Sequence, residues 1–423
     1  DITVNSAFDT NVATGNTGVN LTMEADNNLN VNAAITTHNA DITLSADHDG
    51  DGSGNLNIDA VVASNNGNVI FRGEQVDINQ AVNAGTGSIT IAPNSNQGIF
   101  IAGGTVDNDS ASRLDLSSTE LGLLTAGSVN IGDTAKTGGL TVEGDLDVGT
   151  LGYDLDLLNG GNFSSTNNAF TLGSESIDIN MLGSVSITNN ASNQGINLSA
   201  ITSGTTTTIN LNGSDNALNI TGDVTTGGYN YISSHGTNND VTIGGDISSS
   251  DYSYIYSNGS SGSITLGGDV TAATSNTVWT NSSATNSDVS IGGNVTASNG
   301  GVNLTSHLGD ISVTGNITKS GVGDITLSAG AGDGSKGFTL GGTASMTHDN
   351  TTDLQVISGG SGNIFSDSFF NQTFSLNSVN LRSNGSNDPI NIGGDLTTVG
   401  NLDIHLNGSD NALNITGDVT TGG

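Results

Sequence analysis

The sequence predicts an all-β fold, a single-stranded right-handed parallel β-helix (β-solenoid) with about 23 residues per coil. Three observations lead to this prediction: a short motif that recurs at a coil-sized period, apolar residues at alternate positions inside each copy, and turns rich in Gly, Asn, Asp and Ser. No segment sustains the apolar period of an amphipathic helix. At this coil length the 423 residues form on the order of 18 coils.

The recurring motif is a short stretch in which apolar and polar residues alternate, followed by one or two glycines, an acidic or amide residue and a second alternating stretch. Copies are found at Asn219–Thr225, Thr242–Ser248, Thr265–Thr271, Ser290–Thr296, Ser312–Thr318 and Asn391–Thr397. The glycines that mark the phase recur at similar intervals, at Gly222, Gly245, Gly268, Gly293, Gly315 and Gly342. Such a period is typical of repeat architectures whose units do not fold singly.

Within each copy the apolar residues alternate with polar ones, as in Val241, Ile243 and Ile247. This spacing predicts strands with one buried face. The Gly, Asn and Asp residues between them supply turns. Strands stacked at about 4.7–4.9 Å place each coil in hydrogen bonding with the coils above and below.

Two other all-β folds are compatible with the composition but fit the coil-sized glycine period less well. A string of β-sandwich domains requires turns about every 8–12 residues but no phase-locked glycine. A calcium-bound β-roll requires a glycine-rich nonapeptide, which does not recur here. The persistent glycine phase therefore favours the solenoid.

The chain is predicted to be one continuous solenoid over 1–423, with looser coils over 1–205 and regular Gly-Gly-Asp coils over 206–423. In the first half, Leu29-Asn-Val is echoed by Leu56-Asn-Ile and by Val76-Asp-Ile at coil-sized offsets. An 18-residue block, 211–228, returns unchanged at 406–423. Such identity indicates duplication of a block of several coils. We therefore expect the chain to be a segment of a longer repetitive protein.

Composition limits the partners. The formal net charge is −35, from 41 acidic and six basic residues, and the bases are scattered. A chain of this kind offers no electrostatic footprint for nucleic acid, whereas divalent cations are favoured. No apolar run approaches the roughly 20 residues of a membrane-spanning helix, so membrane insertion is not expected. The absence of cysteine is consistent with an exported protein stabilised by its strand ladders.

The stretch Gly98–Val148 resembles an element of large bacterial exoproteins of the filamentous haemagglutinin type. The residues that carry the resemblance are Leu114–Ser118, Glu120-Leu121, Leu124–Gly127, Val129–Asp133 and Gly139–Val142. The resemblance implies a right-handed parallel β-helix, secreted across a Gram-negative outer membrane to the cell surface or matrix. It also implies a role as an adhesin, a fibre or a matrix component.

One turn has the spacing of a calcium loop. Asp47, Asp49 and Asp51 stand at alternate positions and are followed by Gly52, as oxygen ligands 1, 3 and 5 precede a glycine in such loops. Asn55 is a candidate for a further side-chain or water-mediated ligand. The glutamate expected at position 12 is replaced by Ile58. The alternatives are therefore a calcium site, the one cofactor that the sequence suggests, and a plain acidic turn.

A second acidic pattern follows the coil period. Asp223, Asp246 and Asp269 occupy the same place in three successive coils, so we expect their carboxylates to lie close together. A bridging cation would relieve the repulsion between them. Because Asn294 and Asn316 continue the series without charge, a simple turn preference is the alternative.

The aromatic residues cluster on neighbouring coils. The same count back from Gly245, Gly268 and Gly293 reaches Tyr231, Tyr254 and Trp279, which are predicted to lie in line. Because Ile232 and Ile255 have the opposite parity and point inward, this strip is expected to face solvent. It is then available to glycans or to a neighbouring molecule, the alternative being a ladder that only supports itself. The candidate strip residues are Tyr229, Tyr231, Tyr252, Tyr254, Tyr256 and Trp279.

Catalysis has little support. The best acid and base grouping is Lys319 and Lys336 with Asp324 and Asp333, which chance alone would produce in so acidic a chain. The sequence therefore predicts a non-enzymatic extracellular structural or adhesive protein, the rigid shaft of a surface fibre, with further copies of itself as partners. A glycan-binding or receptor-binding adhesin is the alternative, and a β-helix polysaccharide lyase or hydrolase is a remote one.

Overall fold

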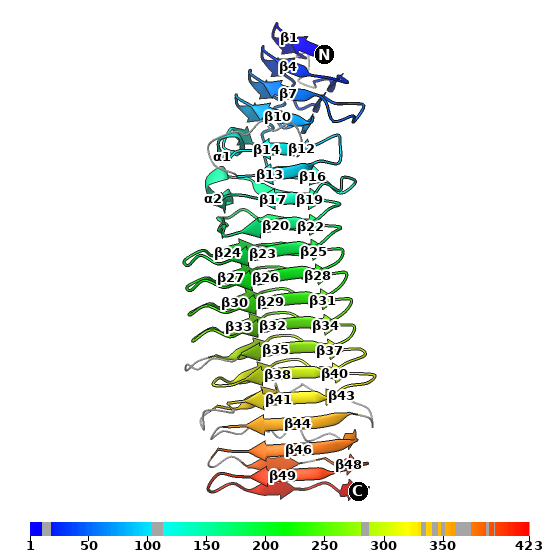
Figure 1. Ribbon diagram of the computed structural model, residues 1–423, viewed down its shortest axis with the longest axis vertical. Coiled ribbons are helices and arrows are strands. Elements are labelled where there is room, and N and C mark those ends of the chain that lie inside the picture. The colour runs from blue at the N-terminus through cyan, green and yellow to red at the C-terminus, as the bar shows by residue number, and fades with distance from the viewer. Residues whose placement is uncertain are drawn as a thin grey trace. The chain divides into compact units, whose positions relative to one another are not determined.

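The fold is known from a computed structural model that describes residues 1–10, 18–102, 113–280, 287–330, 336–340, 346–347, 352–359, 374–385, 389–392 and 394–422. Parallel strands stack as a β-solenoid of about 16 turns with coils roughly 23 residues apart (Figure 1). The predicted all-β parallel solenoid is confirmed. Within these residues helix is confined to two single turns, α1 (Ser118–Leu121) and α2 (Val148–Leu151).

The chain divides into two compact units. The first comprises Asp1–Ile187 and Ile196–Gly204, and the second comprises Thr188–Gly195 and Thr205–Gly423. Strand β23 (Val185–Asn189) belongs in part to each. The predicted glycine phase at Gly342 lies outside the described residues.

Each coil of the second unit contributes strands to parallel sheets, of which three are long. One sheet contains β26 (Thr207–Leu211), β29 (Asn230–Ser234), β32 (Ser253–Ser257), β35 (Asn276–Thr280), β38 (Val302–Ser306), β41 (Ile325–Ala329), β44 (Asp353–Ser358), β46 (Ser378–Ser383) and β49 (Leu402–Leu406). A second contains β27 (Leu218–Ile220), β30 (Val241–Ile243), β33 (Ile264–Leu266), β36 (Val289–Ile291), β39 (Ile311–Val313) and β42 (Phe338–Leu340). The third contains β28 (Val224–Thr226), β31 (Ile247–Ser249), β34 (Val270–Ala272), β37 (Val295–Ala297), β40 (Ile317–Lys319) and β43 (Met346–Thr347).

The last coils of this unit add two short sheets. One contains β45 (Phe374–Leu376), β48 (Leu396–Thr398) and β51 (Val419–Thr421), and the other contains β47 (Ile390–Ile392) and β50 (Leu413–Ile415). The two copies of the 18-residue block fold alike, because β27 and β28 in the first copy recur as β50 and β51 in the second. Asp215 and Asp410, which correspond in the two copies, have positive φ values of 57° and 60°.

The core is a stack of aliphatic side chains in register. Ile232 lies beside Ile255, and Ile255 beside Val278, and each is at most 1% exposed. The inward orientation predicted for the two isoleucines is confirmed. Full burial of one such side chain contributes about 1.5–3 kcal/mol, so the regular alternation makes every coil dependent on its neighbours.

The Gly-Gly-Asp motif forms the corner between two of these sheets. The backbone N–H of Asp246 donates to Oδ1 of Asp223 in the preceding coil, at 2.8 Å. A Cβ atom at Gly245 would lie 2.2 Å from that same oxygen. The aspartate of one coil therefore occupies the space that a side chain would need in the next coil, and this explains why glycine and aspartate recur together.

The corner continues through the following coils. The N–H of Asp269 donates to Oδ1 of Asp246 at 2.8 Å, and the N–H of Asn294 donates to Oδ1 of Asp269 at 2.7 Å. The N–H of Asn316 then donates to Oδ1 of Asn294 at 2.8 Å. Asp and Asn serve equally as acceptors here, so the series is accounted for by backbone capping and needs no bridging cation.

The first unit has coils of more variable length. Two short sheets contain β1 (Ile2–Val4), β4 (Leu29–Val31), β7 (Asn55–Ile58) and β10 (Gln75–Ile78), and β2 (Phe8–Asp9), β5 (Ile35–Thr36), β8 (Val62–Ala63), β11 (Val82–Asn83) and β15 (Leu124–Thr125). A longer sheet contains β3 (Leu21–Glu24), β6 (Ile42–Ser45), β9 (Val69–Arg72), β12 (Ser88–Ala92), β16 (Ser128–Asp133), β19 (Asp154–Asn159), β22 (Ile177–Met181) and β25 (Ala200–Ser203). Two further sheets contain β13 (Gly98–Ile101), β14 (Arg113–Leu116), β17 (Leu140–Val142) and β20 (Phe163–Thr166), and β18 (Leu146–Asp147), β21 (Phe170–Thr171) and β24 (Ile196–Leu198).

The predicted echo between the early strands is confirmed, because Leu29 pairs with Leu56 and Leu56 with Val76. Between β12 and β16 the coil is longer, since Ser88 pairs with Ser128. This coil contains the extra strand β14 and helix α1, whose Glu120 carboxylate accepts the backbone N–H of Ile78 at 2.9 Å. Such long coils are why the chain makes about 16 turns and not 18.

Candidate functional site

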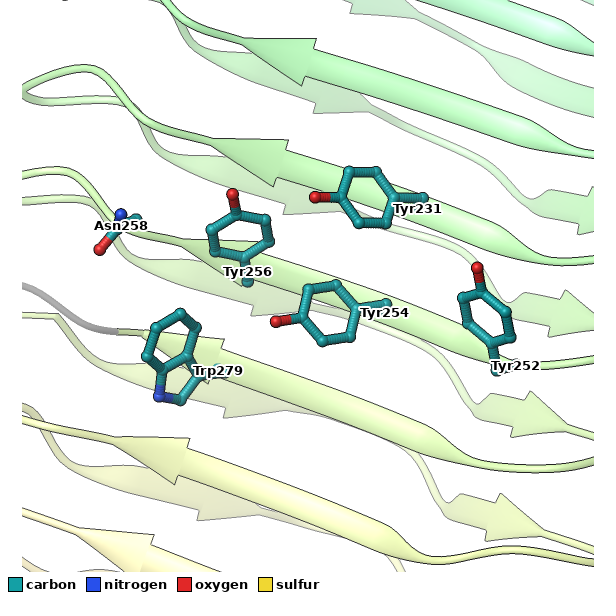
Figure 2. A pocket seen from close by; sticks show the side chains of 6 residues that line it. All are labelled: Tyr231, Tyr252, Tyr254, Tyr256, Asn258 and Trp279. Atoms are coloured by element: carbon teal, nitrogen blue, oxygen red, sulfur yellow. The ribbon is translucent and has the colours of Figure 1, made fainter.

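The aromatic strip lies on β29, β32 and β35 of the second unit, with Tyr229 and Tyr252 directly before the first two of these strands. Tyr231 pairs in register with Tyr254, and Tyr256 pairs with Trp279. These side chains point away from the core because they have the opposite parity to Ile232. Figure 2 shows the rings gathered over three neighbouring strands.

One part of the predicted alignment is wrong. Trp279 does not follow Tyr254 in register, because Thr277 lies opposite Tyr254 and Trp279 lies opposite Tyr256. The coil is longer than the one before it, and its extra length falls after β35, in the connection to β36. The prediction counted a fixed number of residues back from Gly293, and this count included the extra residues that follow β35. It therefore aligned Trp279 with the wrong tyrosine.

The rings stack along the strand-pairing direction. Tyr231 and Tyr254 have centroids 5.5 Å apart with ring planes within 6°, and Tyr229 and Tyr252 have centroids 4.9 Å apart within 2°. These separations are close to the spacing of adjacent strands, so the backbone ladder itself sets the stacking distance.

Tyr256 differs from the other members of the strip, and the prediction that it faces solvent is wrong. It is only 8% exposed, because Tyr231 and Tyr254 meet it edge-on and Trp279 covers it from the next coil at 5.7 Å. Its hydroxyl contacts the His235 ring by a hydrogen bond. Burial, together with the Tyr231 hydroxyl, raises the pKa of the Tyr256 phenol. Tyr256 is therefore better interpreted as part of an aromatic ladder that only supports itself than as part of a surface available to a ligand.

The remaining rings are half-buried, and all of them except Tyr229 line a shallow hollow of about 380 Å³. Its lining residues are Tyr231, Tyr252, Tyr254, Tyr256, Asn258 and Trp279 (Figure 2). Aromatic faces beside phenol and amide groups suit a ligand that has both flat apolar faces and hydroxyl groups. Sequence reasoning missed Asn258 and His235, because neither follows the aromatic spacing.

The acidic turn brings its three aspartates together. One carboxylate oxygen each of Asp47, Asp49 and Asp51 lie within 4.8 Å of one another. Asn55 begins β7, where its backbone N–H donates to Oδ1 of Asn28 at 2.9 Å. The place of the Asn55 side chain among cation ligands stays a prediction.

The described members of the acid and base grouping considered for catalysis each have other partners. Lys319 is 1% exposed and donates to Thr352 Oγ1 at 2.7 Å. Lys336 is paired with Asp310 at 3.2 Å, while Asp324 accepts the backbone N–H of Asp353. Asp333 lies outside the described residues. Lys319 is therefore a buried residue with a structural hydrogen-bond partner.

These coils and corners define the protein as a parallel β-solenoid repeat protein. Comparison with family models, with curated proteins and with solved structures finds no match to the chain. Among the described residues no helix has both the length and the apolar character needed to cross a bilayer.

Proposed function

We propose that the protein is a non-enzymatic extracellular structural protein that serves as the rigid shaft of a bacterial surface fibre. The observation that carries the proposal is the corner ladder, in which each coil caps the backbone of the next through Asp or Asn. These capping hydrogen bonds link each coil to its neighbours at the corner, and the core side chains packed in register link the same coils within the sheets. Bending such a unit requires breaking several contacts at once.

Charge supports a role in display and not in binding nucleic acid. Basic side chains are engaged locally, as in Arg72 with Asp133 at 2.9 Å and Arg113 with Asp115 at 2.8 Å. The net charge of −35 disfavours non-specific aggregation and favours a soluble surface. The resemblance of Gly98–Val148 to bacterial exoproteins gives the same expectation of export to the cell surface.

Electron microscopy of the purified chain tests the proposal. We expect straight particles of constant width, with end-to-end association as the concentration rises. Strings of separate globules, or particles that bend freely between images, would contradict the shaft. Release of reducing sugar from bacterial or host polysaccharides would instead support the lyase or hydrolase alternative.

A second function, glycan binding, is favoured by the hollow over β29, β32 and β35. Tyr231 and Tyr254 stack with their ring planes nearly parallel and remain half-exposed beside Trp279. Parallel aromatic rings of this kind are suited to the flat faces of sugar rings, and their hydroxyl groups add polar contacts.

An immobilised glycan panel tests this second function. The Tyr231→Ala/Tyr254→Ala variant removes one stacked pair and leaves the buried Tyr256 in place. Phe8→Ala, at an aromatic residue 41% exposed in the other unit, is the matched control. Binding that the double variant loses and the control keeps would support the adhesin. Unchanged glycan binding together with unchanged self-association in sedimentation would leave the strip with a structural role only.

A further inference from the structure

The turn between β6 and β7 wraps around the side chain of Asp47. Positive φ values of 47° at Asp47, 70° at Gly50 and 85° at Gly52 fold the chain back on itself. Oδ1 of Asp47 then accepts the backbone N–H groups of Gly52 at 3.0 Å and of Ser53 at 3.2 Å. Glycine is favoured at two of these positions because other side chains strain a left-handed backbone.

The other oxygen of this carboxylate is buried without a partner. Asp47 is 0% exposed, and its Oδ2 accepts no hydrogen bond. An oxygen of Asp49 and an oxygen of Asp51 each lie within 4.8 Å of an Asp47 carboxylate oxygen, so further negative charge faces the first. An unpaired buried carboxylate oxygen is costly, and this site therefore calls for a positively charged ligand.

Three carboxylates meet at this point. The closest oxygens of Asp47, Asp49 and Asp51 lie within 4.8 Å of one another. Oxygens on opposite sides of a calcium ion are separated by about 4.6–5.2 Å, twice the usual calcium–oxygen distance, so these three can share one ion.

A fourth carboxylate comes from the next coil. Glu74 immediately precedes Gln75, which pairs with Asn55, and Glu74 is 6% exposed. Its Oε2 accepts the hydroxyl of Ser95 at 3.1 Å and would lie 3.7 Å from a Cβ at Gly52. Burial, with the charges of Asp47 and Asp51, raises the pKa of Glu74.

Nearby basic groups are committed elsewhere. Arg72 pairs with Asp133 at 2.9 Å, and His48 lies 3.6 Å from Glu24. The Lys136 ammonium donates to the Asn94 carbonyl, which lies beside Gly50. The charge of the turn is therefore left for a ligand to balance.

We propose that Asp47, Asp49 and Asp51 form a calcium site in the 47–53 turn, and that the neighbouring Glu74 carboxylate turns toward the bound ion and so fastens the turn to the next coil. Carboxylates without cysteine or histidine suit a hard cation, and the turn carbonyls supply further oxygens. Glu74 takes the place of the glutamate that a local calcium loop has at its twelfth position. The site goes beyond the shaft function, because it adds a cation-dependent clasp to the first unit.

Isothermal titration of CaCl₂ into the metal-stripped full chain tests the site. We expect one saturable site with a dissociation constant of about 10⁻⁴–10⁻³ M, as in extracellular calcium modules. Asp51→Asn and Asp49→Asn should each weaken binding at least tenfold, and Glu74→Gln severalfold. Asp59→Asn, which removes one exposed charge from another turn, is the matched control and should change nothing. Circular dichroism confirms that each variant is folded.

Four results would overturn the proposal. The first is the absence of saturable heat at millimolar calcium. The second is equal weakening in Asp59→Asn and in Asp51→Asn, which would mean diffuse counterion attraction. The third is full retention of affinity in both Asp49→Asn and Asp51→Asn. MgCl₂ at matched ionic strength should bind at least tenfold more weakly than CaCl₂, because Mg²⁺ gives up its water reluctantly, and equal binding would also contradict a built calcium site.

Discussion

Gly245→Ala is the sharpest perturbation of the corner ladder. The new methyl group would lie 2.2 Å from Oδ1 of Asp223 and 2.5 Å from the carbonyl carbon of Gly222. The carboxylate can rotate away, but then the Asp246 N–H loses its acceptor at 2.8 Å. The backbone contact cannot be relieved without moving the coil.

The expected loss combines these two effects. Overpacking against backbone costs about 1–3 kcal/mol, and the lost hydrogen bond adds about 1 kcal/mol at this exposed position. Gly245→Ala should therefore destabilise the second unit by about 2–4 kcal/mol. Asp223→Ala removes the acceptor alone and should cost about 1 kcal/mol. Asp223→Asn keeps an acceptor and should be nearly neutral, because Asn294 already fills this role for Asn316.

Urea unfolding followed by tryptophan fluorescence measures the effect. The chain has a single tryptophan, Trp279, which lies in the second unit and reports on it. At an m-value of about 3 kcal/mol/M, a loss of about 3 kcal/mol lowers the midpoint by about 1 M. In the Gly245→Ala/Asp223→Ala double variant the carboxylate clash is gone and the Gly222 contact remains. The double variant should therefore lose less than the sum of the single losses.

Two results would refute this reasoning. One is a Gly245→Ala stability within about 0.5 kcal/mol of the wild type, since that is the usual range for a neutral surface substitution. The other is strict additivity in the double variant. Either would mean that the aspartate of one coil and the glycine of the next are independent.

Three further predictions concern the core and its pH dependence. Ile255→Ala should destabilise the second unit by about 2–5 kcal/mol in urea, because its side chain is fully buried between coils. Burial raises the pKa of Tyr153 above its ordinary 10.0, so above that pH the native state keeps a proton that the unfolded chain releases. The melting temperature should therefore fall as pH rises past about 10, and the fall should be less steep in Tyr153→Phe. Burial, then the charge of its register partner Asp178, raises the pKa of Asp156. Asp156→Asn should therefore raise the melting temperature at pH 7, and the gain should disappear below about pH 3.8, where the wild-type carboxyl is protonated.

The fold could be predicted from the sequence because the same residue types recur at the same place in each coil. Gly245 and Asp246 mark the phase, since their packing is set by the equivalent corner of the preceding coil. The alternation around Ile255 predicts which side chains point inward. Both signals are short-range and repeat, so a single sequence contains many copies of them.

The sites were predicted less completely, because they depend on lateral packing between coils. Alternation placed Tyr256 outside the core but could not show that Trp279 covers it. The extra length that follows β35 shifted the tryptophan out of its expected line. Glu74 lies a full coil beyond Asp51 and belongs to no local motif. Only the register of Asn55 with Gln75 brings it to the acidic turn.

Distances between spin labels on one sheet of the second unit test the central claim most directly. Thr225, Ser248, Thr271, Thr296 and Thr318 are successive register partners, and the chain has no cysteine to interfere with labelling. If the coils are stacked, neighbouring register partners are about 4.8 Å apart. The backbones at Thr225 and Thr318 should then be about 19 Å apart, and those at Ser248 and Thr318 about 14 Å apart, with narrow distance distributions. Broad distributions, or distances that do not grow by one strand spacing per coil, would contradict the solenoid.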